Sequence, residues 1–125
     1  MNRPTTQDTW LHARWQRLGD HVRCALYPGD ASRIRLYVQC ALRLTRSADD
    51  GGVAVHLRTL QTLLRTADDE TLPWFWRSVC LEHVNLPYAR LASALSVHDS
   101  TAVRAIDAAI ARSRDRLPAL PPQQG

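Results

Sequence analysis

The sequence predicts an all-α fold, a single compact domain of about six helices. Apolar residues recur at steps of three and four along most of the chain, which is the period of a helix with one buried face. The sequence shows no sustained alternation of apolar and polar residues, the pattern of a half-buried strand. Prolines and a glycine pair separate the periodic segments, as expected for turns between helices.

The N-terminal part, residues 1–66, is predicted to form three helices, the first two of which end at "YPGD" and "SADDGG". Asp30 is a candidate N-cap of the second helix, because its side-chain oxygen can accept a hydrogen bond from a free backbone N–H. The predicted ranges are Thr9–Leu26, Asp30–Thr45 and Val53–Thr66. The expected inward residues are Leu11, Trp15, Leu18, Val22, Leu26, Ile34, Tyr37, Val38, Ala41, Leu44, Val53, Leu57, Leu60 and Leu64.

The C-terminal part, residues 67–117, is predicted to form three more helices that share the same core, followed by a proline-rich tail at residues 118–125. Thr71 can cap the first of them, and Pro73 is tolerated in its first turn. The predicted ranges are Pro73–Val84, Pro87–Leu95 and Ser100–Leu117. The first of these helices is expected to turn inward Leu72, Phe75, Val79 and His83.

Composition limits the class of protein. A chain of 125 residues with 45% apolar residues is long enough to bury a core without disulfides or metal. No apolar run approaches the roughly 20 residues that cross a bilayer, so no membrane partner is expected. The N-terminal residues lack the order of a secretory signal, and three widely spaced cysteines favour reduced thiols. We therefore expect a cytoplasmic protein.

No motif in the sequence indicates catalysis or a cofactor. Phosphate-binding loops and nucleophile elbows are missing, and the acidic clusters Asp49–Asp50 and Asp68–Glu70 are interpreted as solvated loop residues. Two histidine–cysteine pairs could supply zinc ligands in principle: they are His21 with Cys24 and Cys80 with His83. Because cysteines in helices usually act as small core residues, the sequence predicts no metal, and we expect no enzyme.

Residues 88–110 fit the packing of a helix-turn-helix. In that motif two helices meet across a short turn, with a small residue at their crossing and an apolar residue in the turn. Ala92 supplies the small residue, Val97 the apolar one, and Asp99 or Ser100 can cap the second helix. The inward positions hold Leu91, Leu95, Ile106 and Ile110. An ordinary corner between two core helices has the same inward pattern, so both interpretations stay open.

From residue 72 to 117 the chain combines a leucine–proline start, an arginine, a tyrosine-led leucine–alanine helix, a turn with valine and a threonine-led helix that ends in arginines. The matching residues are Leu72, Pro73, Arg77, Tyr88, Leu91, Ala92, Leu95, Val97, Thr101, Ile106, Arg112, Arg114 and Leu117. This pattern resembles region four of bacterial sigma factors and related transcription regulators, over about the last third of the chain. Ser96 departs from it, standing where the family prefers glycine, and Asp99 and Asp107 bring negative charge near the expected DNA-facing side.

The resemblance implies a small regulator of transcription that binds double-stranded DNA, alone or as a homodimer. Thr101 and Arg104 would then lie near base edges, and Ala108 shares their outward face. The residues expected near phosphates are Arg90, Arg112 and Arg114. All 16 basic side chains are arginine and the net charge is +4, which is compatible with a nucleic-acid partner but is also typical of a GC-rich genome.

The aromatic residues support an alternative function. Trp74 and Trp76 flank Phe75, and three consecutive side chains of a helix cannot all face one core. At least one tryptophan is therefore expected at a surface that contacts another protein, with Trp74 and Trp76 as the candidates. A partly covered tryptophan at the junction of the two parts of the chain is the other interpretation. In the alternative function the chain is a helical interaction module, such as an adaptor, a chaperone or a regulatory subunit, and does not bind DNA.

Overall fold

The computed structural model describes residues 6–95, 99–119 and 121, which form helices and no strand. The predicted all-α class is therefore confirmed. In chain order the helices are α1 (Thr6–Cys24), α2 (Ser32–Leu44), α3 (Val53–Ala67), α4 (Trp74–Glu82), α5 (Asn85–Leu95) and α6 (Ser100–Arg116). None of these helices is both long enough and apolar enough to cross a lipid bilayer.

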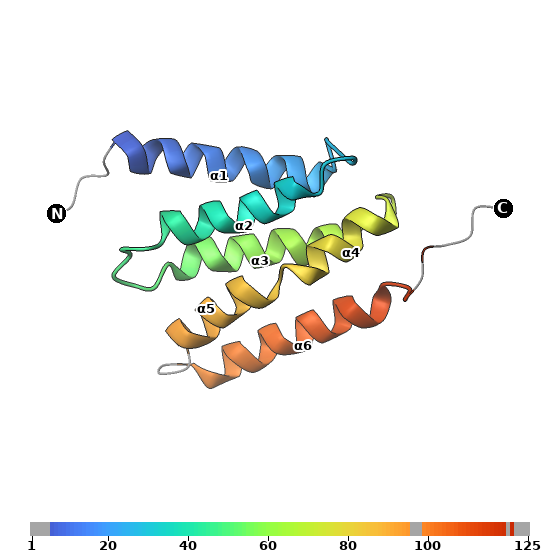
Figure 1. Cartoon of the computed structure of the whole chain (residues 1–125). Coiled ribbons are helices and arrows are strands. Elements are labelled where there is room, and N and C mark those ends of the chain that lie inside the picture. Colours follow the sequence, from blue (N-terminus) through green and yellow to red (C-terminus); the bar gives the residue numbers. More distant parts are fainter. Residues whose placement is uncertain (1–5, 96–98, 120, 122–125) are drawn as a thin grey trace.

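Helix α3 lies in the middle of the molecule. It packs against α1 and α2 on one side and against α4 and α5 on the other, while α6 is the outermost helix beyond them (Figure 1). One hydrophobic cluster includes buried side chains from every helix, among them Trp15, Ile34, Leu63, Trp76, Leu91 and Ile110. The N-terminal and C-terminal parts thus share a single core built around α3.

Helices α4 and α5 form one kinked arm that lies along α3 (Figure 1). Only His83 and Val84 separate them, and the N–H of Tyr88 donates to the Val84 carbonyl at 3.1 Å. Pro87 has no N–H to donate to the carbonyl four residues before it, so a straight helix cannot pass through this point. Helix α5 accordingly begins at Asn85, two residues before the predicted start.

The capping predictions had different outcomes at two helices. The carboxylate of Asp99 accepts the N–H of Ala102 at 3.0 Å, which confirms Asp99 as the N-cap of α6. Asp30 does not cap α2, which starts two residues later. Its carboxylate instead accepts a hydrogen bond from the Ser32 hydroxyl and pairs with Arg33 at 3.4 Å. Asp30 therefore orders the turn before α2 through side chains rather than through a backbone N–H.

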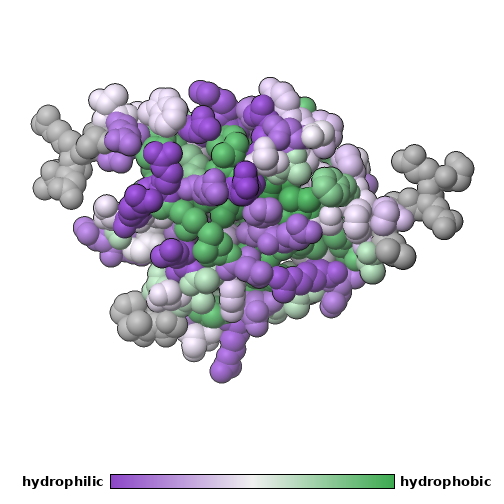
Figure 2. Space-filling model, viewed as in Figure 1, coloured by the Kyte–Doolittle hydropathy of each residue, from purple (hydrophilic) through white to green (hydrophobic). Residues whose placement is uncertain are grey.

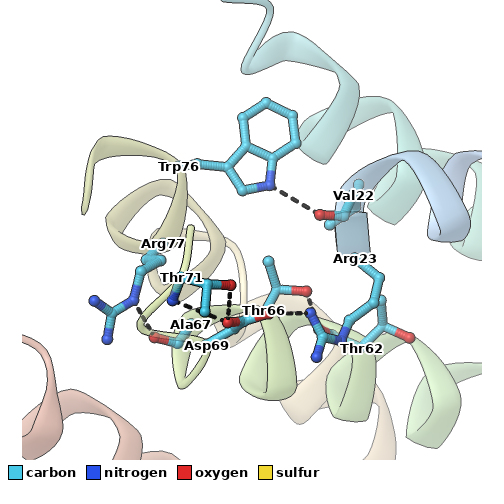
Figure 3. A network of polar contacts seen from close by, with 9 residues as sticks. All are labelled: Val22, Arg23, Thr62, Thr66, Ala67, Asp69, Thr71, Trp76 and Arg77. Atoms are coloured by element: carbon cyan, nitrogen blue, oxygen red, sulfur yellow. Dashed lines mark hydrogen bonds and ion pairs between the residues drawn. The ribbon is translucent and has the colours of Figure 1, made fainter. Parts of the chain in front are cut away.

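The inward face of α4 agrees with the prediction at Val79, which is buried, but not at Phe75. Phe75, expected inside, is 59% exposed, whereas the neighbouring Trp76 is only 1% exposed. The indole N–H of Trp76 donates to the Val22 carbonyl at 2.9 Å, and Nε of Arg77 donates to the Ala67 carbonyl at 2.8 Å (Figure 3). These carbonyls belong to the last turns of α1 and α3, where backbone acceptors lack some or all of their helical partners. Two consecutive side chains of α4 therefore cap the ends of two other helices.

We predict that Arg77→Met destabilises the fold. Methionine keeps the length of the buried stem but leaves the Ala67 carbonyl without the Arg77 donor, so the free energy of unfolding should fall by about 2 kcal/mol. Urea denaturation followed by circular dichroism measures this change. Arg35→Met, at an exposed position of α2, is the control and should change the value by less than about 0.5 kcal/mol. Equal effects of the two variants would contradict the capping role of Arg77.

Candidate functional site

The outward face of α6 holds most of the residues predicted to meet DNA. Thr101, Arg104, Ala108 and Arg112 are all exposed, and their steps of three and four residues place them on one stripe of the helix. Ile110 lies on the opposite face and is buried. In Figure 2, hydrophilic residues lie among paler ones along the lower edge of the molecule, where Figure 1 places α6. The stripe therefore has two long cationic side chains, Arg104 and Arg112, and two short uncharged ones, Thr101 and Ala108.

The last turns of α6 fix this orientation. Arg114 donates to Oδ1 of Asn85 at the start of α5, at 3.0 Å. Arg116 pairs with Asp68, just beyond the end of α3, at 3.2 Å. Both arginines are exposed, but each holds α6 to the rest of the bundle. The predicted phosphate contact Arg114 therefore has one donor engaged within the protein.

Helix α6 runs back alongside the arm formed by α4 and α5 (Figure 1). Just after its end, the Pro118 carbonyl accepts the indole N–H of Trp74, the first residue of α4, at 2.7 Å. The expected inward residues of the helix-turn-helix pattern pack against the core; they are Leu91, Leu95, Ile106 and Ile110. The turn residue Val97 lies outside the described residues. The arrangement leaves α6 as an edge helix with its outer face open.

Arg90 is not part of the α6 stripe. It is exposed on α5 and lies close enough to His56 of α3 to act on its charge. Burial, and to a smaller extent the charge of Arg90, lower the pKa of His56. The structure thus brings together four of the six predicted DNA contacts on one stripe of α6, whereas Arg90 lies on α5.

One of the two tryptophans predicted to contact a protein partner lies inside the molecule. Trp76 is buried in the core, so the prediction that it contacts a partner is wrong. The cause is its hydrogen bond to the end of α1, which turns its indole inward. Trp74 is half-buried, and the exposed aromatic residue of this helix is Phe75. Trp10 of α1 is also exposed, at 56%, and Arg14 lies over its ring at 5.5 Å.

A groove between α1 and α3 was not predicted. It has a volume of about 420 Å³, and Arg23, Arg58 and Arg65 are among the residues that line it. Arg58 and Arg65 are seven residues apart, two turns along α3, so both lie on one face of that helix. The spacing is visible in the sequence, but nothing there indicates that α1 would form the opposite wall with Arg23.

Tyr37 of α2 forms the floor of this groove. Its ring stacks on Trp15, with centroids 6.2 Å apart and planes 11° from parallel. A Cβ atom at Gly19 would lie 3.0 Å from the Tyr37 ring, so glycine is what allows the ring to lie against α1. Burial raises the pKa of Tyr37, although hydrogen bonds with Thr62 and Thr59 oppose the shift. The tyrosine is therefore a neutral hydroxyl at physiological pH.

An ion pair anchors one end of the groove. Arg23 contacts the carboxylate of Asp69 at 2.8 Å (Figure 3). Asp69 also accepts the N–H of Thr71 at 3.0 Å and its hydroxyl at 2.5 Å. The prediction that Thr71 caps α4 is therefore wrong, because the Thr71 hydroxyl donates to Asp69 instead. The hydroxyl of Thr71 and then the guanidinium of Arg23 lower the pKa of Asp69 to about 2.

The cysteines are not arranged for metal binding. Among the described residues there is no group of three or more histidine, cysteine, aspartate or glutamate side chains placed to hold a metal ion. Cys80 is buried, and this burial raises the pKa of its thiol to about 12. Nδ1 of His83 lies 2.9 Å from the carbonyl of Val79 in its own helix. All three cysteines are free thiols, and Cys24 is the exposed one.

No family model, curated protein or solved structure matches this chain. The candidate surfaces are the outward face of α6 and the groove between α1 and α3. The first is a convex cationic stripe and the second is a concave cationic recess.

We predict a specific acid sensitivity from Asp69. The folded state holds its pKa at about 2, below the ordinary value of 3.8, so ionised Asp69 stabilises the fold above pH 3.8. This contribution is lost as the pH falls through about 2. Thermal melts of wild type and Asp69→Asn should therefore differ most at neutral pH and converge in strong acid. Asp107→Asn, on the exposed face of α6, controls for the loss of one carboxylate. A difference that stays constant down to pH 2 would contradict the role of Asp69.

Proposed function

We propose that this protein is a small DNA-binding regulator of transcription that lays the outward face of α6 against double-stranded DNA. The supporting observation is that the four arginines of α6 fall into two groups, one bound to the bundle and one facing outward. Arg114 and Arg116 hold the helix to the bundle, whereas Arg104 and Arg112 project from the open stripe and form no ion pair with another described residue. Two guanidinium groups are thus available to an external anion.

The chemistry of the stripe suits a duplex. Arginine offers a planar fork that matches the major-groove edge of guanine and the oxygens of phosphate. Thr101 and Ala108 have short side chains, which allow a helix to approach the bases closely. By the resemblance to sigma region four, Thr101 and Arg104 would contact base edges and Arg112 a phosphate. Arg90, exposed on α5 outside the α6 stripe, stays a predicted phosphate contact.

The carboxylates of α6 set a limit on affinity. Asp107 and Asp115 are exposed on the same helix and repel phosphate, against four arginines that attract it. The net charge of the helix stays positive, so binding to any duplex should be detectable at low salt and should weaken as the salt concentration rises. Such a balance suits a regulator that finds one site in a bacterial cytoplasm, as a monomer or a homodimer.

A specific observation also supports the alternative, a helical interaction module. Phe75 is 59% exposed and directly follows the half-buried Trp74 at the start of α4. Exposed aromatic side chains are the kind of surface that a protein partner covers. In this case α4, rather than α6, would carry the binding surface and DNA would not be a ligand.

We predict that Arg104→Ala combined with Arg112→Ala weakens binding to mixed-sequence duplex DNA by at least about tenfold at low salt, because charge-assisted contacts are lost. The dependence of log affinity on log salt should fall by about one for each phosphate contact removed. Fluorescence anisotropy over a series of salt concentrations measures both values.

The matched control is Arg35→Ala combined with Arg43→Ala. Both residues are exposed on α2, and the double variant loses the same charge as the α6 variant. An equal loss of affinity in the two double variants would show that total charge, not the α6 face, governs binding. No detectable binding of the wild type at low salt would overturn the DNA proposal and leave Phe75 as the better-supported contact.

A further inference from the structure

The groove between α1 and α3 concentrates positive charge. Arg23, Arg58 and Arg65 line it together with Asp20, and at one end Arg23 and Arg65 also border a second recess that holds Asp68, Asp69 and Glu70. Arg23 is paired with Asp69, but neither Arg58 nor Arg65 forms an ion pair with another described residue. Like charges that share one recess repel each other, and a multiply charged anion between them would remove that repulsion.

The floor of the groove is polar. Tyr37 and Thr62 both line the recess, and each side chain carries a hydroxyl group. A Cβ atom at Gly19 would lie 3.2 Å from the Tyr37 hydroxyl oxygen, so glycine keeps the floor open beside α1. Hydroxyl groups at the bottom of a cationic recess favour a ligand with oxygen atoms over an apolar one.

The volume of the groove indicates the size of the ligand. At about 420 Å³ it falls within the range of roughly 300–1,000 Å³ that is typical of small-molecule sites. It is wider than one inorganic phosphate needs. One of its arginines is also held in place, because the Asp69 carboxylate fixes Arg23 at 2.8 Å. A cation that is already positioned loses less conformational entropy when an anion binds.

We infer that this groove binds a small organic molecule that carries several negatively charged oxygens. Arg58 and Arg65 supply the guanidinium forks that contact the anionic groups, and Arg23 contributes charge at one end. The Tyr37 hydroxyl and its neighbour Thr62 contact a neutral oxygen of the same molecule. Phosphate esters and polycarboxylates share this chemistry. The site lies on α1, α2 and α3 and uses no residue of the α6 stripe, so it does not depend on the DNA proposal.

Isothermal titration calorimetry of the full chain at low ionic strength tests the site, with pyrophosphate as one probe and citrate as the other. The wild type should bind one equivalent of at least one probe, and the tighter probe identifies phosphate or carboxylate as the preferred group. Arg58→Ala combined with Arg65→Ala should weaken this binding by about tenfold or more, because two charged donors are removed. Both positions are exposed, so the fold should be retained.

Two controls locate the site. Arg35→Ala combined with Arg43→Ala removes the same charge from α2 outside the groove and should leave affinity within about twofold. The α6 variant with Arg104→Ala and Arg112→Ala should bind the probes like the wild type, whether or not it binds DNA. The inference is overturned if neither probe binds the wild type, or if the α2 control loses as much affinity as the groove variant.

A third variant tests the floor directly. Gly19→Ala places a methyl group against the Tyr37 ring, where a Cβ atom would lie at 3.0 Å, and should narrow the groove. With the helical circular dichroism spectrum unchanged, probe binding should weaken while DNA binding stays as in the wild type. Unchanged probe binding in this variant would place the anion elsewhere and overturn the inference.

Discussion

The arrangement of this bundle depends on two adjacent side chains of α4, each of which donates a hydrogen bond to the end of a different helix. Trp76 reaches the last turn of α1 at Val22, and Arg77 reaches the last residue of α3 at Ala67. Both side chains are buried, so each hydrogen bond forms away from water, where an unpaired donor or acceptor is costly. The Val22 carbonyl also accepts the backbone N–H of Ala25 at 3.2 Å. The positive charge of Arg77 also interacts favourably with the negative end of the α3 dipole. Helix α4 is thereby fixed in rotation as well as in position.

The orientation of both candidate sites depends on this corner, the place where Trp76 and Arg77 of α4 bind the ends of α1 and α3. Since α4 and α5 form one kinked arm, fixing α4 also fixes Asn85 at the start of α5, to which Arg114 anchors α6. The outward stripe of α6 is the face left open by this anchoring. On the other side of the corner, the chain between α3 and α4 positions Asp69, which holds Arg23 at one end of the groove. The contacts of α4 therefore orient both the outward cationic stripe of α6 and the cationic groove between α1 and α3.

The sequence was sufficient to predict the helices and the outward stripe of α6, because both depend on periodicity within one segment. It did not predict which aromatic residue at the start of α4 faces the core. In the run Trp74-Phe75-Trp76 all three residues are apolar, so periodicity within this run does not indicate which of them is buried. Trp76 is buried because its indole N–H donates to the Val22 carbonyl, 54 residues away in the sequence. The groove was missed for a similar reason. The spacing of Arg58 and Arg65 is local, but the wall that faces them comes from α1 and the floor from α2.

The strengths of the ion pairs and of the buried hydrogen bonds decide how far a ligand in the groove could disturb the rest of the molecule. Arg23 and Arg116 are 42% and 60% exposed in their ion pairs with Asp69 and Asp68, so water screens both pairs and each pair alone adds little to stability. The hydroxyl of Thr71 contributes more than Arg23 to the lowered pKa of Asp69. The buried donors Trp76 and Arg77 matter more, since a lost partner at such a site costs about 1–3 kcal/mol. An anion that draws Arg23 away from Asp69 therefore breaks only a weak contact. The capped corner stays intact, and α6 keeps its orientation while the groove is occupied.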